Sequence, residues 1–198
     1  MNKFEQLDEL LQKNNGFLKT ADVIDAGISK TYLGNYVRER DLERVALGVY
    51  MSQDAWVDEM YVLQARFPQI VFSHETALYL WDLAEREPLK YTVTAKSTLN
   101  TTNISRQGVK VYKVIEERYN VGITEVDSPA GHSLKVYNPE RTICDLIRSK
   151  RNVEIQDFQT ALRGYVRYKE KNLSLLLKYA QQFQIEKTLR QYLEVLLV

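Results

Sequence analysis

The segment from Leu18 to Met51 constrains the fold of this chain more than any other, because it reads as two short helices followed by a hairpin. Thr20 is the expected N-cap of the first helix, and Gly27 is expected to end that helix in a left-handed conformation. Ser29 can cap a second helix that runs to about Arg40, since its hydroxyl can accept from the free N–H groups of the first turn.

The residues after the second helix predict a wing. Leu42–Met51 reads as two short strands that fold back on each other, and residues 2–14 have the spacing of a further amphipathic helix. Three helices and a hairpin in this order predict a winged helix-turn-helix, in which the second helix of the motif enters the major groove of DNA.

The polar face of the second helix supplies the candidate DNA contacts. Leu33 and Val37 form an i,i+4 pair for the core, so the polar and aromatic residues of the helix that lie off this stripe are left for the outer face. Residues near the start of the helix would read base edges, and basic residues beside it and on the wing would hold phosphates. The candidate DNA-binding residues are Lys19, Ser29, Lys30, Thr31, Tyr32, Asn35, Tyr36, Arg38, Arg40 and Arg44.

The charge of this segment leaves a second interpretation open. From Lys30 to Met51 there are four Lys or Arg against three acids, and the net charge of all 198 residues is +1. DNA-binding domains are ordinarily more basic. The acids form one cluster, Glu39, Asp41 and Glu43, which can face away from the groove. The alternative is that the winged helix serves only as a scaffold.

The remainder of the chain predicts an α+β domain. A helix from about Ser52 to Arg66, with Trp56, Met60 and Leu63 on one side, would connect it to the winged helix. Strands are then gathered in the middle and helices at the end, which favours a central antiparallel sheet with several C-terminal helices over βαβ units. The expected strands are 89–95, 109–115, 121–126 and 133–137, and the expected helices are 74–83, 139–149, 154–168, 172–184 and 185–197. The predicted domains are a winged helix-turn-helix over 1–54, a bridging helix over 55–69 and a larger mixed domain over 70–198.

Residues that would carry catalysis are scarce. The chain has two histidines and one cysteine, too few for a zinc site, and Cys144 lies in an apolar helical pattern that predicts burial. There is no glycine-rich phosphate loop, and no Asp or Glu is followed two residues later by Lys, as in many metal-dependent nucleases. We therefore expect no enzyme activity, no cofactor and no metal; a nuclease with an atypical site is the alternative.

The C-terminal helices carry an excess of positive charge. From Arg148 to Arg190 there are ten Lys or Arg and four acids, and Arg163 and Arg167 lie one turn apart on a helix. Such a surface fits an acidic partner or a nucleic acid, or is an ordinary solvated face. The candidate surface comprises Arg148, Lys150, Arg151, Arg163, Arg167 and Lys169.

Several phrases resemble those of AbiEi-type antitoxins, the antitoxin half of the abortive-infection E (type IV) toxin–antitoxin systems. The wing Leu42–Tyr50 is similar to the family's wing, with its Arg-Val and Gly-x-Tyr. Phe72–Leu80, Tyr91–Ala95 and the Pro-Glu-Arg-Thr phrase of Asn138–Leu146 are similar to segments of the antitoxin domain. Together the similar phrases span nearly the whole chain.

The resemblance implies a bacterial protein of a phage-resistance operon with two roles. Its winged helix would bind inverted repeats in double-stranded promoter DNA and repress the operon. Its larger domain would counteract a nucleotidyltransferase-like toxin, without necessarily forming a stable complex. Arg141 and Asp145 of the shared phrase are better interpreted as structural, because they lie i,i+4 on one helix and can pair with each other or hold neighbouring backbone. With no signal peptide and no apolar run of membrane length, we expect a cytoplasmic protein with no membrane partner.

Overall fold

The computed structural model describes residues 2–196, which divide into two compact units. Unit 1 comprises the chain up to Pro68 together with Asp127–Leu134. Unit 2 comprises Gln69–Val126 together with the chain from Lys135 onward. The predicted α+β class with an N-terminal winged helix-turn-helix is confirmed. In the described part of the chain, none of the helices combines the length and apolar character that crossing a membrane requires.

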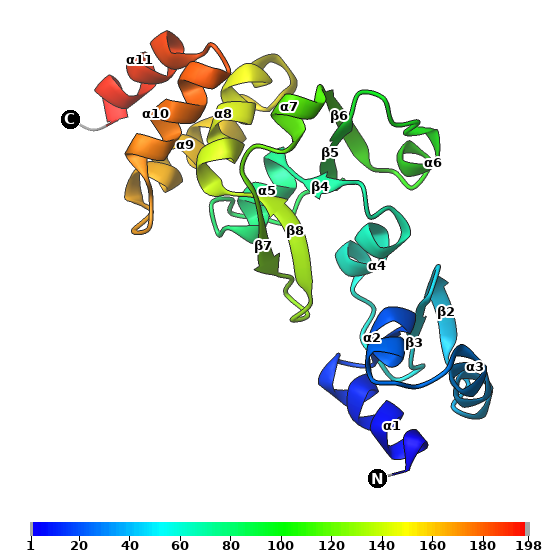
Figure 1. The fold of residues 1–198 in the computed structure, drawn as a ribbon. Coiled ribbons are helices and arrows are strands. Elements are labelled where there is room, and N and C mark those ends of the chain that lie inside the picture. Colours follow the sequence, from blue (N-terminus) through cyan, green and yellow to red (C-terminus); the bar gives the residue numbers. More distant parts are fainter. Residues whose placement is uncertain (1, 197–198) are drawn as a thin grey trace. The chain divides into compact units, whose positions relative to one another are not determined.

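Unit 1 contains the predicted three helices and hairpin, drawn in blue in Figure 1. Its elements are α1 (Lys3–Lys13), β1 (Phe17–Lys19), α2 (Thr20–Asp25), α3 (Lys30–Glu39), β2 (Glu43–Ala46), β3 (Val49–Met51) and α4 (Glu59–Arg66). The sheet has the order β1-β3-β2 and is antiparallel throughout. The strand β1 is an addition that the sequence did not predict.

The turn residues of the helix-turn-helix adopt the predicted conformations, with one exception. Gly27 has φ +75°, and the Ser29 hydroxyl accepts from the Tyr32 N–H at 3.3 Å as the N-cap of α3. The prediction that Thr20 caps the first helix is wrong, because Thr20 is already its first residue and Lys19 is the N-cap. β1 ends at Lys19 and α2 begins at the next residue, Thr20. The Thr20 N–H donates to the Gly48 carbonyl of the wing turn at 2.8 Å.

The helix expected from about Ser52 to Arg66 begins later than predicted. It starts at Glu59 because the Asp58 carboxylate caps it, with Oδ1 accepting from the Tyr61 N–H at 2.9 Å. Trp56 therefore lies before the helix, and it is 89% exposed rather than part of an apolar stripe. Met60 and Leu63 are buried as expected.

Unit 2 places its strands in the middle of the chain and its helices mainly at the end (Figure 1). The strands are β4 (Val71–Phe72), β5 (Thr92–Lys96), β6 (Lys110–Val114), β7 (Ile123–Asp127) and β8 (Ser133–Tyr137). The helices are α5 (His74–Leu80), α6 (Thr102–Ser105), α7 (Glu116–Tyr119), α8 (Pro139–Arg148), a 3₁₀ turn over Lys150–Asn152, α9 (Ile155–Arg167), α10 (Leu173–Gln182) and α11 (Glu186–Leu196). The four C-terminal helices agree with prediction over the described residues, and residue 197 of the last predicted helix lies outside them. α6, α7 and β4 are additions.

The five-stranded sheet has the order β6-β5-β4-β8-β7 and is mixed. β4 pairs with β5 antiparallel, whereas β5 pairs with β6 and β4 pairs with β8 in parallel. A parallel pair needs a crossover rather than a tight turn, and residues 97–109, with α6 inside them, provide it between β5 and β6. The sheet therefore departs from the purely antiparallel arrangement that strand order alone suggests.

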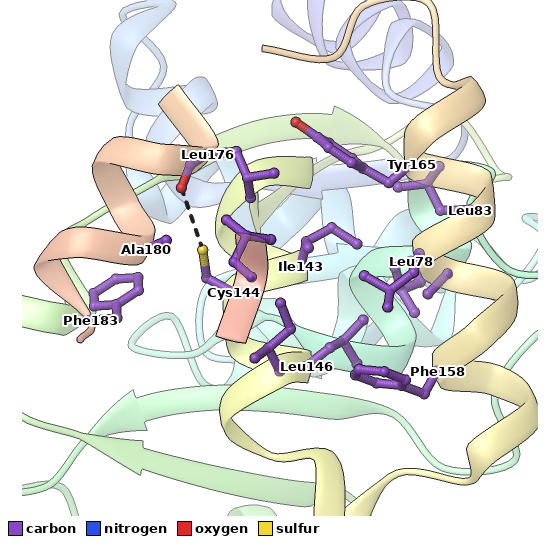
Figure 2. Packing of buried hydrophobic residues seen from close by; sticks show 14 residues of the cluster. Leu78, Leu83, Ile143, Cys144, Leu146, Phe158, Tyr165, Leu176, Ala180 and Phe183 are labelled. Atoms are coloured by element: carbon purple, nitrogen blue, oxygen red, sulfur yellow. Dashed lines mark hydrogen bonds between the residues drawn. The ribbon is translucent and has the colours of Figure 1, made fainter. Parts of the chain in front are cut away.

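The core of the helical part of unit 2 is built around α8, as Figure 2 shows. Ile143, Cys144 and Leu146 of α8 are fully buried among residues of α5, α9 and α10. The predicted burial of Cys144 is confirmed: burial raises the pKa of its thiol to about 12, and Sγ contacts the Leu176 carbonyl at 3.9 Å (Figure 2). Nucleophilic cysteines need a lowered pKa, whereas that of Cys144 is raised. Cys144 therefore contributes to the packing of the core.

The Pro-Glu-Arg-Thr phrase begins α8 and holds its surroundings together. Asn138 caps the helix by accepting from the Arg141 N–H at 2.9 Å, with Pro139 in the first turn. The Arg141 side chain is fully buried, and its Nε donates to Asp145 Oδ2 at 2.8 Å. Its Nη1 donates to the Val121 carbonyl at 2.8 Å. The structural interpretation of Arg141 and Asp145 is confirmed.

Candidate nucleic-acid interface

Helix α3 presents one polar and one apolar side. Lys30, Thr31, Asn35 and Arg38 are exposed, whereas Leu33 is only 3% exposed. An i, i+1, i+5, i+8 series of exposed polar residues covers the outward side of a helix that is packed on its other side. The residues that were expected to read base edges thus share one accessible surface at the start of α3.

Tyr36 does not belong to that surface. The prediction that it lies on the outer face is wrong, because the residue is 0% exposed and its hydroxyl donates to Asp8 Oδ1 of α1 at 2.7 Å. Burial, followed by the Asp8 hydrogen bond, raises the pKa of the Tyr36 phenol above its ordinary value. Tyr32 is half-buried, and its ring contacts the Phe4 ring edge-on at 5.4 Å. Both tyrosines therefore anchor α3 on α1.

Arg38 orients Asn35 on the exposed side of α3. Arg38 Nη2 donates to Asn35 Oδ1 at 2.6 Å, and Arg38 Nε donates to the Gly34 carbonyl at 3.3 Å. Because Arg38 occupies the carbonyl oxygen of the Asn35 amide, the two N–H donors of that amide remain to bind acceptors of a ligand. Acceptors at base edges in the major groove are N7 of purines, O6 of guanine and O4 of thymine.

Arg40, the C-cap of α3, forms an ion pair with Asp8 of α1. Its Nη2 donates to Asp8 Oδ2 at 2.6 Å, with the two side chains 48% and 35% exposed. An ion pair at this exposure is screened by water and contributes little to stability. Arg40 can therefore exchange Asp8 for a phosphate at small cost.

The wing carries one basic and one apolar candidate. Arg44 is exposed on β2, and its Nε donates to the Ala46 carbonyl at 3.4 Å beside a register shift between β2 and β3. Leu47 occupies the turn between these strands and is 86% exposed. The sequence interpretation did not single out Leu47, although an apolar residue directly before the turn glycine Gly48 was a readable signal.

Two further basic residues frame the wing. Lys19 is exposed at the end of β1, with Nζ 5.0 Å from the centre of the Tyr61 ring. Arg66 of α4 donates from Nε to the Val45 carbonyl at 2.7 Å, which supports β2 from behind. Arg66 therefore stabilises the backbone of the wing strand β2.

The six basic residues proposed as a second surface have different environments in unit 2. Arg163 and Arg167 are exposed on α9, and Lys150 donates from Nζ to the Tyr192 hydroxyl at 2.8 Å. Arg148 has a side chain that is only 26% exposed and lies 3.6 Å from Asp145 Oδ1. Arg151 and Lys169 are exposed in the connections after α8 and α9. Arg148 is therefore the member whose environment differs from an open basic face.

Within residues 2–196, no group of three or more His, Cys, Asp or Glu side chains is arranged to hold a metal ion. In unit 1 the interface just described is made of hydrogen-bond donors, amides and one exposed leucine. Exposed cations and side-chain amides of this kind are groups that can contact phosphates and base edges.

Comparison with known proteins finds a family similar to the first part of the chain. Residues 5–53 match the family model described as "Transcriptional regulator, AbiEi antitoxin". The crystal structure of the RV2827C protein from Mycobacterium tuberculosis is similar in fold, with a TM-score of 0.51 at 12% sequence identity, over 90% of this chain and 72% of that one. No curated protein matches this sequence. The matched residues 5–53 take in nearly all of α1 and the whole of α2, α3 and β1–β3, so this part of the chain resembles the AbiEi antitoxin family of transcriptional regulators in both sequence and winged-helix geometry.

Proposed function

We propose that this protein is the antitoxin and autorepressor of a bacterial toxin–antitoxin operon of the abortive-infection type. It binds inverted repeats in its own promoter through unit 1 and counteracts a nucleotidyltransferase-like toxin through unit 2. The observation that carries the DNA-binding half is the exposed side of α3, where Lys30, Thr31 and Asn35 share one accessible surface beside the wing. Its site of action is the cytoplasm, where promoter DNA is found.

The residues of unit 1 divide between two tasks in this proposal. Lys30, Thr31 and Asn35 read base edges, because they lie on the first two turns of the helix that enters the major groove. The phosphate contacts come from the exposed cations around α3 and the wing, and these fix the register of the protein without reading sequence. They are Lys19, Arg38, Arg40 and Arg44.

A gel-shift titration with DNA from upstream of the gene tests the proposal. Specific binding that survives scrambled competitor, in two steps on paired repeats, is the expected result. Arg44→Ala should weaken binding to all sequences alike and lower the slope of log affinity against log salt by about 1. Arg106→Ala, which removes an exposed arginine of unit 2, is the matched control and should leave both unchanged. An unaltered salt slope in Arg44→Ala would remove the wing from the interface.

The second candidate function is a protein-binding module in which the winged helix is only a scaffold. The observation that favours it is the pair of exposed arginines, Arg163 and Arg167, one turn apart on α9, which fits an acidic surface of a toxin. Co-purification with the product of the neighbouring gene discriminates between the two. A stable complex that Arg163→Glu with Arg167→Glu abolishes, together with absent operator binding, would replace the first proposal by the second.

A further inference from the structure

Unit 2 contains a cavity of about 400 Å³ that lies apart from the exposed arginines of α9. Its polar lining comes from α5, β6, α8 with the residue after it, and α11, and consists of His74, Tyr112, Lys113, Asp145, Arg148, Ser149 and Thr188. The cavity has the size of a small-molecule site, and it combines convergent polar groups with apolar wall. The apolar part of its wall is Val114, Ile147 and Ile185.

The position of His74 in this wall is fixed from several directions. Its ring is stacked on the Tyr112 ring, with centroids 3.6 Å apart, and the residue is 3% exposed. Its φ of +50° is uncommon for a residue with a side chain, and such conformations gather at functional sites. The surrounding structure therefore holds an unfavourable backbone conformation at the cavity.

A chain of hydrogen bonds runs through His74 to the cavity. Thr94 Oγ1 donates to Ser73 Oγ at 2.9 Å, and Ser73 Oγ lies 3.0 Å from His74 Nδ1. His74 Nε2 lies 3.2 Å from Ser149 Oγ at the other side of the ring. The neutral imidazole carries its hydrogen on one of these two nitrogens, and in the Nε2 tautomer Ser149 Oγ accepts it. In that tautomer the Ser149 hydroxyl keeps its own proton to donate into the cavity.

The electrostatic environment of the cavity favours an anion. Burial, followed by the positive charges of Lys110, Arg141 and Arg148, lowers the pKa of His74 to about 3, so the ring is neutral and its surroundings are positive. Asp145, the acid of the cavity wall, is already paired with Arg141 through Oδ2 at 2.8 Å. Arg148 reaches its other oxygen at 3.6 Å only, so this cation is poorly neutralised.

We propose that this cavity binds a small phosphate monoester. The phosphate oxygens accept from the Arg148 guanidinium and the Ser149 hydroxyl, with Lys113 at the edge of the cavity. Guanidinium and phosphate match in geometry, and hydrogen bonds between charged groups are the stronger ones. The organic part of the ester contacts the apolar wall at Ile147 and Ile185.

Calorimetric titration of the full chain, at constant ionic strength, with phenyl phosphate and with inorganic phosphate tests this site. We expect saturable 1:1 binding of phenyl phosphate, weakened about 10- to 100-fold in Arg148→Gln, which is the effect of losing one hydrogen bond to a charged group. Ser149→Ala should weaken binding several-fold. Arg106→Gln removes an exposed arginine of the same unit outside the cavity, and its affinity should equal that of the wild type.

Three results would overturn the proposal: no saturable binding of phenyl phosphate, binding undiminished in Arg148→Gln, or equal affinity for inorganic phosphate, which would refute an ester as the ligand. If Arg148→Gln does not fold, Ser149→Ala decides by the same criterion. The titration contains no DNA, so its outcome is independent of the repressor proposal.

Discussion

Helices α3 and α8 begin in the same way and use their charged residues in opposite ways. Each starts at a side-chain cap, with Ser29 accepting from Tyr32 N–H in α3 and Asn138 accepting from Arg141 N–H in α8. Of the ten residues of α3 only two are buried, whereas nine of the ten residues of α8 are buried. The arginines of α3 are exposed and held by one or two hydrogen bonds each, while Arg141 is enclosed and held by several.

The difference separates the residues that we propose for DNA recognition from those that hold unit 2 together. An exposed arginine with a single weak partner can exchange it for a phosphate at little cost. A buried arginine has lost its hydration, so each of its hydrogen bonds is needed to offset that loss. Arg141 is also packed between the rings of Tyr137 and Phe183, at 4.2 Å and 4.5 Å from their centres. The Pro-Glu-Arg-Thr phrase is accordingly a folding motif, and ligand contacts are to be sought elsewhere.

Arg141→Ala should give the largest effect. It leaves Asp145 buried without its main partner and opens a space between two rings, so we expect unit 2 to lose about 3–5 kcal/mol of unfolding free energy. Trp81 is partly buried in unit 2, and its indole donates to the Tyr137 carbonyl at 2.8 Å. In a Trp56→Phe background, the fluorescence of Trp81 during urea unfolding reports on that unit alone. Arg163→Ala on α9 should change stability by less than about 0.5 kcal/mol, and equal losses in the two variants would contradict the contrast.

Asn35→Ala in α3 should have the opposite effect to Arg141→Ala: it should weaken operator binding and leave stability nearly unchanged. In the proposed interface the Asn35 amide reads a base, so its removal should cost about 1–3 kcal/mol of operator binding and relax specificity at one position of the site. Stability should stay within about 0.5 kcal/mol, since the side chain is exposed. The measurement is competition binding with a set of operators that each carry one substituted base pair. Uniform weakening on every sequence would mean that Asn35 positions the backbone and does not read bases.

The parts of this fold that the sequence predicted are those dictated by short-range chemistry. Gly27, the Ser29 cap and the Asn138-Pro139 start depend on a few neighbouring residues, and all three are found as expected. Tyr36 was misplaced because its partner, Asp8, is far away in the sequence, and helical spacing alone left its side of α3 undecided.

The cavity beside His74 could not have been predicted from the sequence for the same reason. His74 of α5, Tyr112 of β6 and Ser149 after α8 are far apart in the sequence and line one cavity only in the folded unit. The exposed Leu47 could have been found, because it directly precedes the glycine of a predicted turn. Long-range pairing therefore limits what the sequence shows of buried side chains and of the cavity, while the choice among neighbouring capping residues, as at Thr20 and Asp58, limits the helix boundaries.

The buried His74 of unit 2 should make the stability of that unit depend on pH. Its pKa is about 3 in the folded chain and about 6.5 in an unfolded chain, so below pH 6.5 the unfolded state takes up a proton that the folded state refuses. Stability is thus lost as the pH falls, by about 2 kcal/mol between pH 7.5 and pH 5. His74→Asn, a residue that tolerates a positive φ and does not titrate, should remove that share of the pH dependence. Identical pH profiles for the two proteins, followed by Trp81, would mean that His74 is not buried in its neutral form.

Asp8→Asn should have the smallest effect and bears on the exposed side of the comparison. Asp8 holds Arg40 at 2.6 Å and Tyr36 at 2.7 Å, through different oxygens. Asparagine keeps an acceptor for the Tyr36 hydroxyl and removes the charge that competes with phosphate for Arg40. Operator affinity should therefore rise a few-fold, by less than about 1 kcal/mol, while stability changes by no more than about 1 kcal/mol. The check is a titration of wild type and Asp8→Asn, each with and without Arg40→Ala. If the gain persists when Arg40 is absent, it comes from the lost negative charge of α1 alone, and Arg40 is not a phosphate contact.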